Sequence, residues 1–401
     1  MRAHLKVKSI TILDEVDYEQ DNTGAGNPCA AALWLSQAID LYNDDTNSFG
    51  ISGWLGFAAY NDGHETSVID DTSRIRLSFE RKERNGWTAY AVTEWGINMV
   101  TSDDNLVLQG GRLAAEKTDD FLNNRLGYVG LSHDTWGSLT FGKQWGAYYD
   151  VAGTTDLPNV VAGYAVGAYT FGDGGLTGTG RADAAFQYRN DFGPLHLALQ
   201  YAAKQDGEVS VQDSNGEPLA NSELDFDSSY GASLTYSVTD KFKLLAGFNR
   251  GDIDGHLEGT ELKVTNQIVG IGAMYGDYYH YAPNREASGL YVGFNAHKSD
   301  NNELVGGELY DATGAELMVA YQYDNGFVPI AMLSYLDLDT DQHSAIQGNW
   351  RRQFAMVGLH YRYSRDTVMF FEAKLDFSDM DDPAEDAAQD NNFAVGINYF
   401  F

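Results

Sequence analysis

Apolar and polar side chains alternate along the chain from residue 49 onward. In the last such segment, Phe393, Val395, Ile397, Tyr399 and Phe401 occupy every second position. A period of two over about ten residues is typical of a β-strand with one apolar and one polar face. The pattern predicts sixteen strands, at residues 49–60, 72–84, 87–98, 125–133, 136–145, 181–191, 195–204, 226–238, 241–250, 264–276, 289–298, 315–325, 327–337, 352–363, 367–377 and 392–401.

The connections between these segments alternate between short and long. Tight turns such as 85–86, 239–240, 325–326 and 364–366 alternate with long connections at 61–71, 99–124, 146–180, 205–225, 251–263, 299–314, 338–351 and 378–391. One connection, 277–288, is longer than its place in the alternation predicts. An even number of antiparallel strands with short turns at one end and long loops at the other indicates a transmembrane β-barrel.

A soluble β-sandwich or propeller is the competing interpretation of the alternation. Its strands would be shorter, about five or six residues, and its connections would lack the long and short regularity. A sheet that spans a lipid bilayer must close, because an open edge would leave backbone groups unpaired. A barrel of sixteen strands is too wide for side chains to fill, so it holds a water-filled channel.

Charge and composition exclude several other classes. The 401 residues include 26 basic and 58 acidic side chains, a net charge of −32, so electrostatic binding to nucleic acid is excluded. No run of 18 strongly apolar residues occurs, which excludes a helical membrane protein. The chain has one cysteine, Cys29, and no motif for a metal or cofactor, so we predict neither. An outer-membrane hydrolase using His133, His196 or His360 is a minor alternative to a protein without enzymatic activity.

The first 38 residues differ from the rest of the chain. Residues 29–35, CAAALWL, are apolar and precede Ser36 and Ala38, which suit signal-peptidase cleavage. Acidic residues separate this run from the basic residues near the start. We interpret residues 1–38 as an atypical or mis-started export signal and residues 39–401 as one barrel domain. The alternative is a disordered acidic tail.

Several segments resemble the classical trimeric general porins of Gram-negative outer membranes. They are IDLYNDDTNSFGISGWLGF at 39–57, NRLGYVGLSHDTWGSLTFGKQWGAYYDVAGTTDLP from Asn124, GRADAAFQYRN around Arg181, and the terminal FAVGINYFF. The resemblance implies a homotrimer of sixteen-stranded barrels in the outer membrane, with short periplasmic turns and long extracellular loops. It also implies that the third loop, about 146–180, folds into the lumen as a constriction loop.

The resemblance also implies the residues of the pore constriction. It places Arg76, Arg125 and Arg181 in an arginine cluster on the wall, opposite two loop acids of which Asp156 is one and Asn159 replaces the other. Trp54 stands where a lysine is usual, Trp145 and Tyr149 match aromatic residues at the loop entry, and the terminal Phe401 matches an assembly signal. Alternation supports the inward position of the arginines, with Ile75, Leu126 and Ala182 assigned to the lipid face.

The function implied is passive diffusion of small hydrophilic solutes and ions. Alternatives are a solute-specific channel, for example for sugars that stack on Trp54, Trp145 and Tyr149, and a plugged structural or adhesive surface barrel. Six stretches in or beside the long connections, 61–71, 206–227, 251–261, 300–311, 337–343 and 376–390, hold 29 acids and no lysine or arginine. We therefore expect weak cation selectivity, and contact with lipopolysaccharide through divalent cations. The resemblance adds the outer-membrane barrel assembly machinery as a partner.

Overall fold

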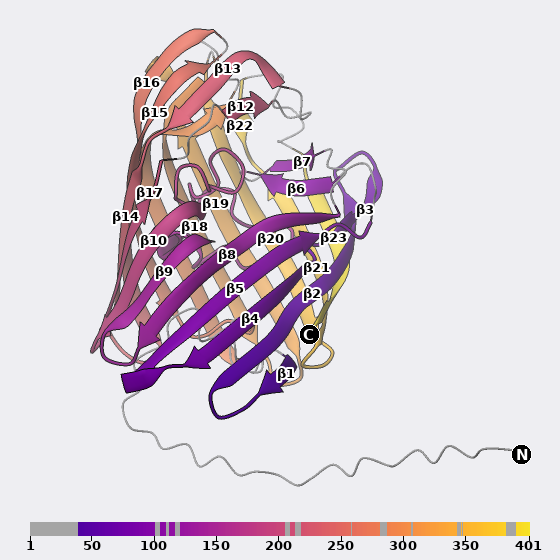
Figure 1. The fold of residues 1–401 in the computed structure, drawn as a ribbon. Coiled ribbons are helices and arrows are strands. Elements are labelled where there is room, and N and C mark those ends of the chain that lie inside the picture. The colour runs from indigo at the N-terminus through magenta and orange to yellow at the C-terminus, as the bar shows by residue number, and fades with distance from the viewer. Residues whose placement is uncertain are drawn as a thin grey trace, which may run out of the picture.

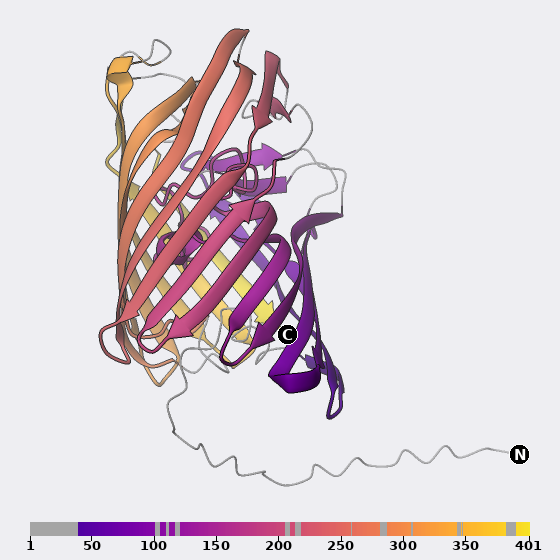
Figure 2. The same ribbon diagram turned by 60° about the vertical axis from the view of Figure 1, so that its left-hand side comes forward.

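The computed structural model describes residues 39–100, 105–109, 112–116, 121–204, 209–212, 218–257, 259–280, 287–305, 308–342, 346, 348–381 and 390–401. These residues form a closed antiparallel barrel of sixteen strands, which confirms the predicted fold class (Figures 1 and 2). The predicted export signal, residues 1–38, lies outside the described residues. No helix in the described part of the chain is long and apolar enough to cross a membrane.

The wall strands follow one another in chain order, and each overlaps one predicted segment. They are β2 (Asn47–Asn61), β4 (Arg74–Lys82), β5 (Trp87–Ile97), β8 (Leu122–His133), β9 (Gly137–Trp145), β10 (Arg181–Phe192), β11 (Leu195–Ala202), β14 (Ser229–Ser237), β15 (Phe242–Leu257), β16 (Thr260–Tyr275), β17 (Gly289–Val305), β18 (Glu308–Gln322), β19 (Phe327–Leu338), β20 (Trp350–Arg362), β21 (Thr367–Asp376) and β23 (Asn392–Phe400).

The barrel closes where the last strand meets the first. β23 pairs with β2 from Trp54 opposite Phe400 to Asn61 opposite Phe393. Phe401 and Gly53 exchange backbone hydrogen bonds of 3.0 and 2.9 Å at the end of this ladder. The short strand β1 (Ile39–Asn43) pairs with residues 48–51 of β2 and continues the line of β23. The two ends of the described chain therefore meet on one edge of β2.

The remaining elements lie in the connections between the wall strands. They are β3 (Thr66–Asp70), β6 (Asn105–Gln109), β7 (Arg112–Glu116), β12 (Val209–Gln212), β13 (Pro218–Phe226), β22 (Asp379–Met380), the one-turn helix α2 (Tyr149–Ala152), and the 3-10 turns η1 (Arg84–Gly86) and η3 (Thr340–Gln342).

In two connections predicted as long loops, the wall strands themselves continue. The β15–β16 ladder continues to Leu257 opposite Thr260, and the β17–β18 ladder to Val305 opposite Glu308. The prediction of loops at 251–263 and 299–314 was therefore wrong. These hairpins rise beyond the barrel wall, as Figure 2 shows for β15 and β16, so their outer faces need not be apolar. The inner faces of these extensions still bury apolar side chains: Ile253 and Leu309 belong to one cluster with Leu224 and Phe226.

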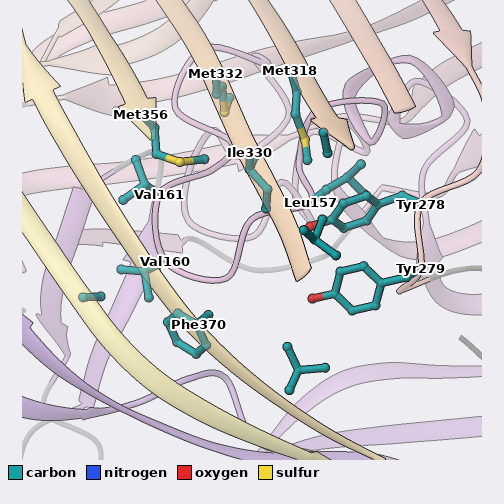
Figure 3. Close-up of a cluster of buried hydrophobic side chains, with 14 of the residues drawn as sticks. Leu157, Val160, Val161, Tyr278, Tyr279, Met318, Ile330, Met332, Met356 and Phe370 are labelled. Carbon is teal, nitrogen blue, oxygen red and sulfur yellow. The ribbon is translucent and has the colours of Figure 1, made fainter. Parts of the chain in front are cut away.

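The outer face of the wall is apolar, and part of the inner face is apolar as well. In β19, Phe327 and Leu333 are exposed on the outside, whereas Ile330 and Met332 are buried on the inside. The inward side chains join a cluster with Leu157 and other residues of the connection 146–180 (Figure 3). In the sector of β17–β21 the lumen is therefore occupied by packed side chains.

Leu333 provides a test of the membrane-facing surface. It is 58% exposed, near the middle of β19. We expect Leu333→Arg to destabilise the folded barrel in lipid vesicles by about 2–4 kcal/mol, the cost of a cation at the bilayer midplane. Urea unfolding in vesicles measures this, with Leu333→Met as the apolar control. Equal stability of the two variants would show that Leu333 does not face lipid.

Candidate functional site

Residues 146–180, which connect β9 to β10, fold into the lumen and bind the opposite wall. The backbone N–H groups of Asn159, Val160 and Val161 donate to the carboxylate of Glu372 in β21, at 2.7, 2.9 and 2.9 Å. His360 contacts the same carboxylate, with 3.0 Å between its Nε2 and Oε1. A chain segment outside the ladders needs such acceptors, because buried N–H groups must be paired. Glu372 therefore fastens the tip of this connection.

A second buried carboxylate holds the connection from β18. Glu316 Oε1 accepts from the N–H of Ala165 at 2.9 Å, and its Oε2 accepts from Thr155 Oγ1 at 2.7 Å. Asn295 in β17 donates to Thr155 Oγ1 at 2.6 Å, and Tyr291 donates to the carbonyl of Thr154 at 2.7 Å. Thr154, Thr155 and Ala165 of the connection are thus hydrogen-bonded to the wall strands β17 and β18.

Glycines on the wall make room for this contact. A Cβ on Gly293 would lie 1.9 Å from the carbonyl oxygen of Thr154, and one on Gly247 would lie 2.9 Å from Val151. A Cβ on Gly270 would lie 3.0 Å from the ring of Tyr148. These wall positions require glycine because the inward segment lies directly on the strands.

The opposite wall carries an arginine cluster around one buried carboxylate. Glu94 in β5 is 1% exposed and bonds Arg76, whose Nε lies 3.0 Å from its Oε2, and Arg125, whose Nε lies 2.9 Å from its Oε1. Arg74 lies 3.8 Å from Oε1 and places its guanidinium 3.7 Å from the ring centre of Trp54. Three guanidinium groups share one carboxylate, so this wall carries excess positive charge.

Local bulges change how these arginines reach the lumen. In β8 the register shifts so that Arg125 is an extra residue between Leu126, opposite Glu94, and Asn124, opposite Trp95. Leu126 is 2% exposed and Ala182, beside a second shift in β10, is fully buried. The assignment of Leu126 and Ala182 to the lipid face was therefore wrong. Strict alternation fails there because a bulge changes the face to which the following residues point.

Arg181 is held at the end of the inward segment. Its Nε lies 3.2 Å from Asp173 Oδ2, and Lys143 Nζ lies 2.8 Å from the same oxygen. Burial opposes ionisation, but the charges of Arg181 and Lys143 outweigh it and lower the pKa of Asp173. The Arg181 guanidinium lies 5.8 Å from the ring centre of Trp145, which stacks on Tyr149 at 3.9 Å.

Asp156 faces the arginine wall from the inward segment. It accepts hydrogen bonds from Tyr149 at 2.6 Å and from Tyr169. Burial, together with the neighbouring Asp156 carboxylate, raises the pKa of Tyr169 well above its ordinary value, so this phenol stays protonated and keeps donating. The side-chain Nδ2 of Asn159 is buried and has no partner among the described residues.

A cavity of about 170 Å³ lies between the arginine wall and the inward segment. Seven of the eight predicted constriction residues line it: Trp54, Arg125, Trp145, Tyr149, Asp156, Asn159 and Arg181. Arg76 is not part of this lining and is paired with Glu94; Arg74, two residues earlier on the same strand, lines the cavity instead. Sequence reasoning missed Arg74, although it shares the parity of Arg76.

The residues considered for other chemistry have structural contacts. His360 is fully buried between Glu372 and the Tyr279 hydroxyl, whose oxygen lies 2.9 Å from Nδ1. His196 pairs with Asp191, and His133 contacts the Asn85 carbonyl. Within the described residues, no group of three or more His, Cys, Asp or Glu side chains is placed to hold a metal ion.

Comparisons with known proteins agree with this architecture. The family described as Gram-negative porin matches residues 42–401. Outer membrane protein F of Serratia marcescens is 26% identical over 395 residues, covering 93% of this chain and 97% of that protein. Outer membrane porin N of Escherichia coli is 23% identical over 399 residues, with the same coverage. The structure of Salmonella typhi OmpF in complex with daunomycin has a TM-score of 0.69 at 18% identity, covering 90% of this chain and 100% of that one.

The chain belongs to the Gram-negative porin family. It is therefore a multi-pass β-barrel protein of the bacterial outer membrane and not an enzyme.

Gly293 offers a test of how the inward segment is seated. We expect Gly293→Ala to displace Thr154 from the wall, because the added methyl group would overlap its carbonyl oxygen. The single-channel current should become larger or more variable. Gly127→Ala in β8 is the control, since a Cβ there would meet no described atom closer than 3.8 Å. Identical current distributions for both variants would contradict this account.

Proposed function

We propose that the chain forms a water-filled channel for passive diffusion of small hydrophilic solutes and ions across the outer membrane. The observation that carries this proposal is the lumenal cavity, which is lined by Arg125 and Arg181 from the wall strands and by Asp156 from the inward segment. Opposed charges across a narrow passage create a transverse field, which orients dipolar solutes and replaces part of their hydration. Such a passage favours small polar molecules over apolar ones.

Two charge distributions of opposite sign would set the ion preference. Six stretches in or beside the long connections hold 29 acids and no lysine or arginine, whereas the cavity is lined by Arg74, Arg125 and Arg181 together with Asp71 and Asp156. Rim charges act from a distance through solvent and are screened by salt, whereas charges at the passage act on an ion in contact. We therefore propose weak cation selectivity that depends on salt concentration and that the arginines oppose.

The proposed assembly is a homotrimer. We infer this from family membership and extend it to three further partners: lipopolysaccharide bridged by divalent cations to the acidic rim, small hydrophilic solutes and ions in the lumen, and the barrel assembly machinery. Phe401, whose backbone bonds Gly53 at the point of closure, is the proposed assembly signal. The acidic residues near the rim, such as Asp252 and Asp379, are exposed and suited to divalent cations.

A sugar-specific channel is less well supported. Saccharides stack on exposed aromatic faces, but Trp145 is stacked on Tyr149 and the Trp54 ring is covered by the Arg74 guanidinium. These rings help to shape the passage, but they do not form a continuous surface on which a sugar could stack.

Planar-bilayer recording tests the proposed function. We expect the purified protein to insert with three equal conductance steps, since each subunit of a trimer carries its own passage. Current block by micromolar oligosaccharide would favour the sugar-specific channel instead. Absence of conductance from correctly folded protein would favour a plugged structural barrel.

Reversal potentials test the ion preference. The Debye length falls from about 30 Å at 0.01 M salt to about 3 Å at 1 M, so cation preference should be clear in dilute salt and weak or absent in concentrated salt. Replacing Arg125 and Arg181 by Ala should raise cation selectivity at both concentrations. The variant with both Arg125 and Arg181 replaced by Lys, which keeps the two positive charges in the lining, is the control. Unchanged selectivity in the alanine variant would remove these residues from the passage.

A further inference from the structure

The described residues of the connection between β16 and β17 lie inside the lumen at the short-turn end of the barrel. This connection is the one whose length, 277–288, departs from the alternation of the other turns. Tyr278 and Tyr279 are 2% and 0% exposed, and Ala287 is 6% exposed. A turn that extended into water would leave these side chains exposed. The described part of this connection, residues 276–280 and 287–288, is called the inner turn below.

Two wall strands, β18 and β20, bind the inner turn. Gln322 in β18 accepts from the N–H of Tyr279 and donates to the carbonyl of Asp277, both at 2.7 Å. Arg362 in β20 donates to the carbonyl of Ala287 at 2.8 Å. These bonds satisfy backbone groups that have left the ladder, so the inward path is a built part of the fold.

The inner turn also packs against the connection 146–180. Tyr278 and Tyr279 belong to the same buried cluster as Leu157 and Val160 (Figure 3). A chain of polar contacts joins the two segments through the wall: Tyr279 Oη lies 2.9 Å from His360 Nδ1, and His360 Nε2 lies 3.0 Å from Glu372 Oε1. The same Oε1 accepts from the N–H of Asn159 at 2.7 Å. Two inward segments, one from each end of the barrel, therefore meet in the lumen.

His280 is the residue of the inner turn that reaches the cavity described above. It is half-buried and lines this cavity together with Trp54, Asn398 and the arginines. Its ring lies 5.6 Å from that of Phe400, at the short-turn end of β23. His280 thus borders the passage from the side opposite to the long loops.

We propose that the inner turn is a second constricting element and that His280 is a residue of the permeation path that restricts solute size. The inference rests on the proposed diffusion function, because it assigns a role within that passage. A solute that crosses between Asp156 and the arginines must then pass the imidazole of His280. The width of the passage is then limited by both inward segments, so shortening the connection 146–180 alone would not widen it fully.

Thiol modification during bilayer recording tests this proposal. The His280→Cys variant is made in a Cys29→Ser background, so that it carries the sole thiol of the chain. A methanethiosulfonate reagent with a trimethylammonium group should reduce the current in irreversible steps. The control is His133→Cys in the same background: His133 contacts Trp87 and the Asn85 carbonyl at the short-turn end but does not line the cavity. Its modification should leave the current unchanged.

The outcomes separate this proposal from the diffusion function. If the Cys29→Ser protein conducts but modified His280→Cys shows an unchanged current, or its thiol is not labelled, the second constriction is overturned and the channel function stands. If Cys29→Ser protein in folded form does not conduct, the proposed function itself fails.

Liposome swelling gives an independent measurement that does not depend on a thiol. The His280→Ala variant should raise the swelling rate with a disaccharide relative to that with a monosaccharide, because a side chain at the opening is removed. His133→Ala should leave the ratio unchanged. An equal ratio in His280→Ala and the parent protein would also overturn the proposal.

Discussion

The bonds between two buried glutamates and the backbone of residues 146–180 are the interaction on which the lumen depends. A segment that crosses a barrel has N–H groups with no neighbouring strand, and burying them unpaired costs about 1–3 kcal/mol each. Glu372 accepts three such N–H groups and Glu316 accepts one more. Each of these bonds pairs an N–H group that would otherwise be buried without a partner, so a few wall carboxyl groups fix the position of a long irregular segment. The position of Asp156 opposite the arginines follows from this attachment.

The two sides of the lumen have different physical character. Between β17 and β21 the inner surface is filled, because Met318, Ile330 and Met356 share one buried cluster with residues of the two inward segments. On the side of β4, β5 and β8 the surface is cationic, with Glu94 as the shared counter-ion. Packing on one side therefore confines the solvent-accessible passage to the charged side. A barrel of sixteen strands is wide enough for a large aqueous channel, but the passage through this one is narrow and lined by charged side chains.

Much of the wall could be predicted from sequence, since lipid outside and water inside impose a period of two on every spanning strand. That rule fails where the environment changes. Beyond residue 250 the hairpin β15–β16 rises above the barrel wall, and at Arg125 a bulge shifts the register. The inward course of residues 146–180 was predicted only from the resemblance to porins. The apolar residues on both faces of β19 were a usable signal that something packs inside, but the pattern alone cannot distinguish lipid from a folded segment. Alternation does not specify how far a side chain reaches. It therefore could not show that Arg74 lines the cavity and that Arg76 is paired with Glu94 instead.

The closure of the barrel between β2 and β23 has a consequence for how the chain folds. The pairing of Trp54 with Phe400 joins residues near the two ends of the domain, so this ladder forms only after all intervening strands have been made. Contacts of such high sequence separation form slowly, and until they form both β2 and β23 present unpaired edges that can bind other chains. Until this ladder forms, the unclosed sheet is therefore prone to aggregate through these two edges.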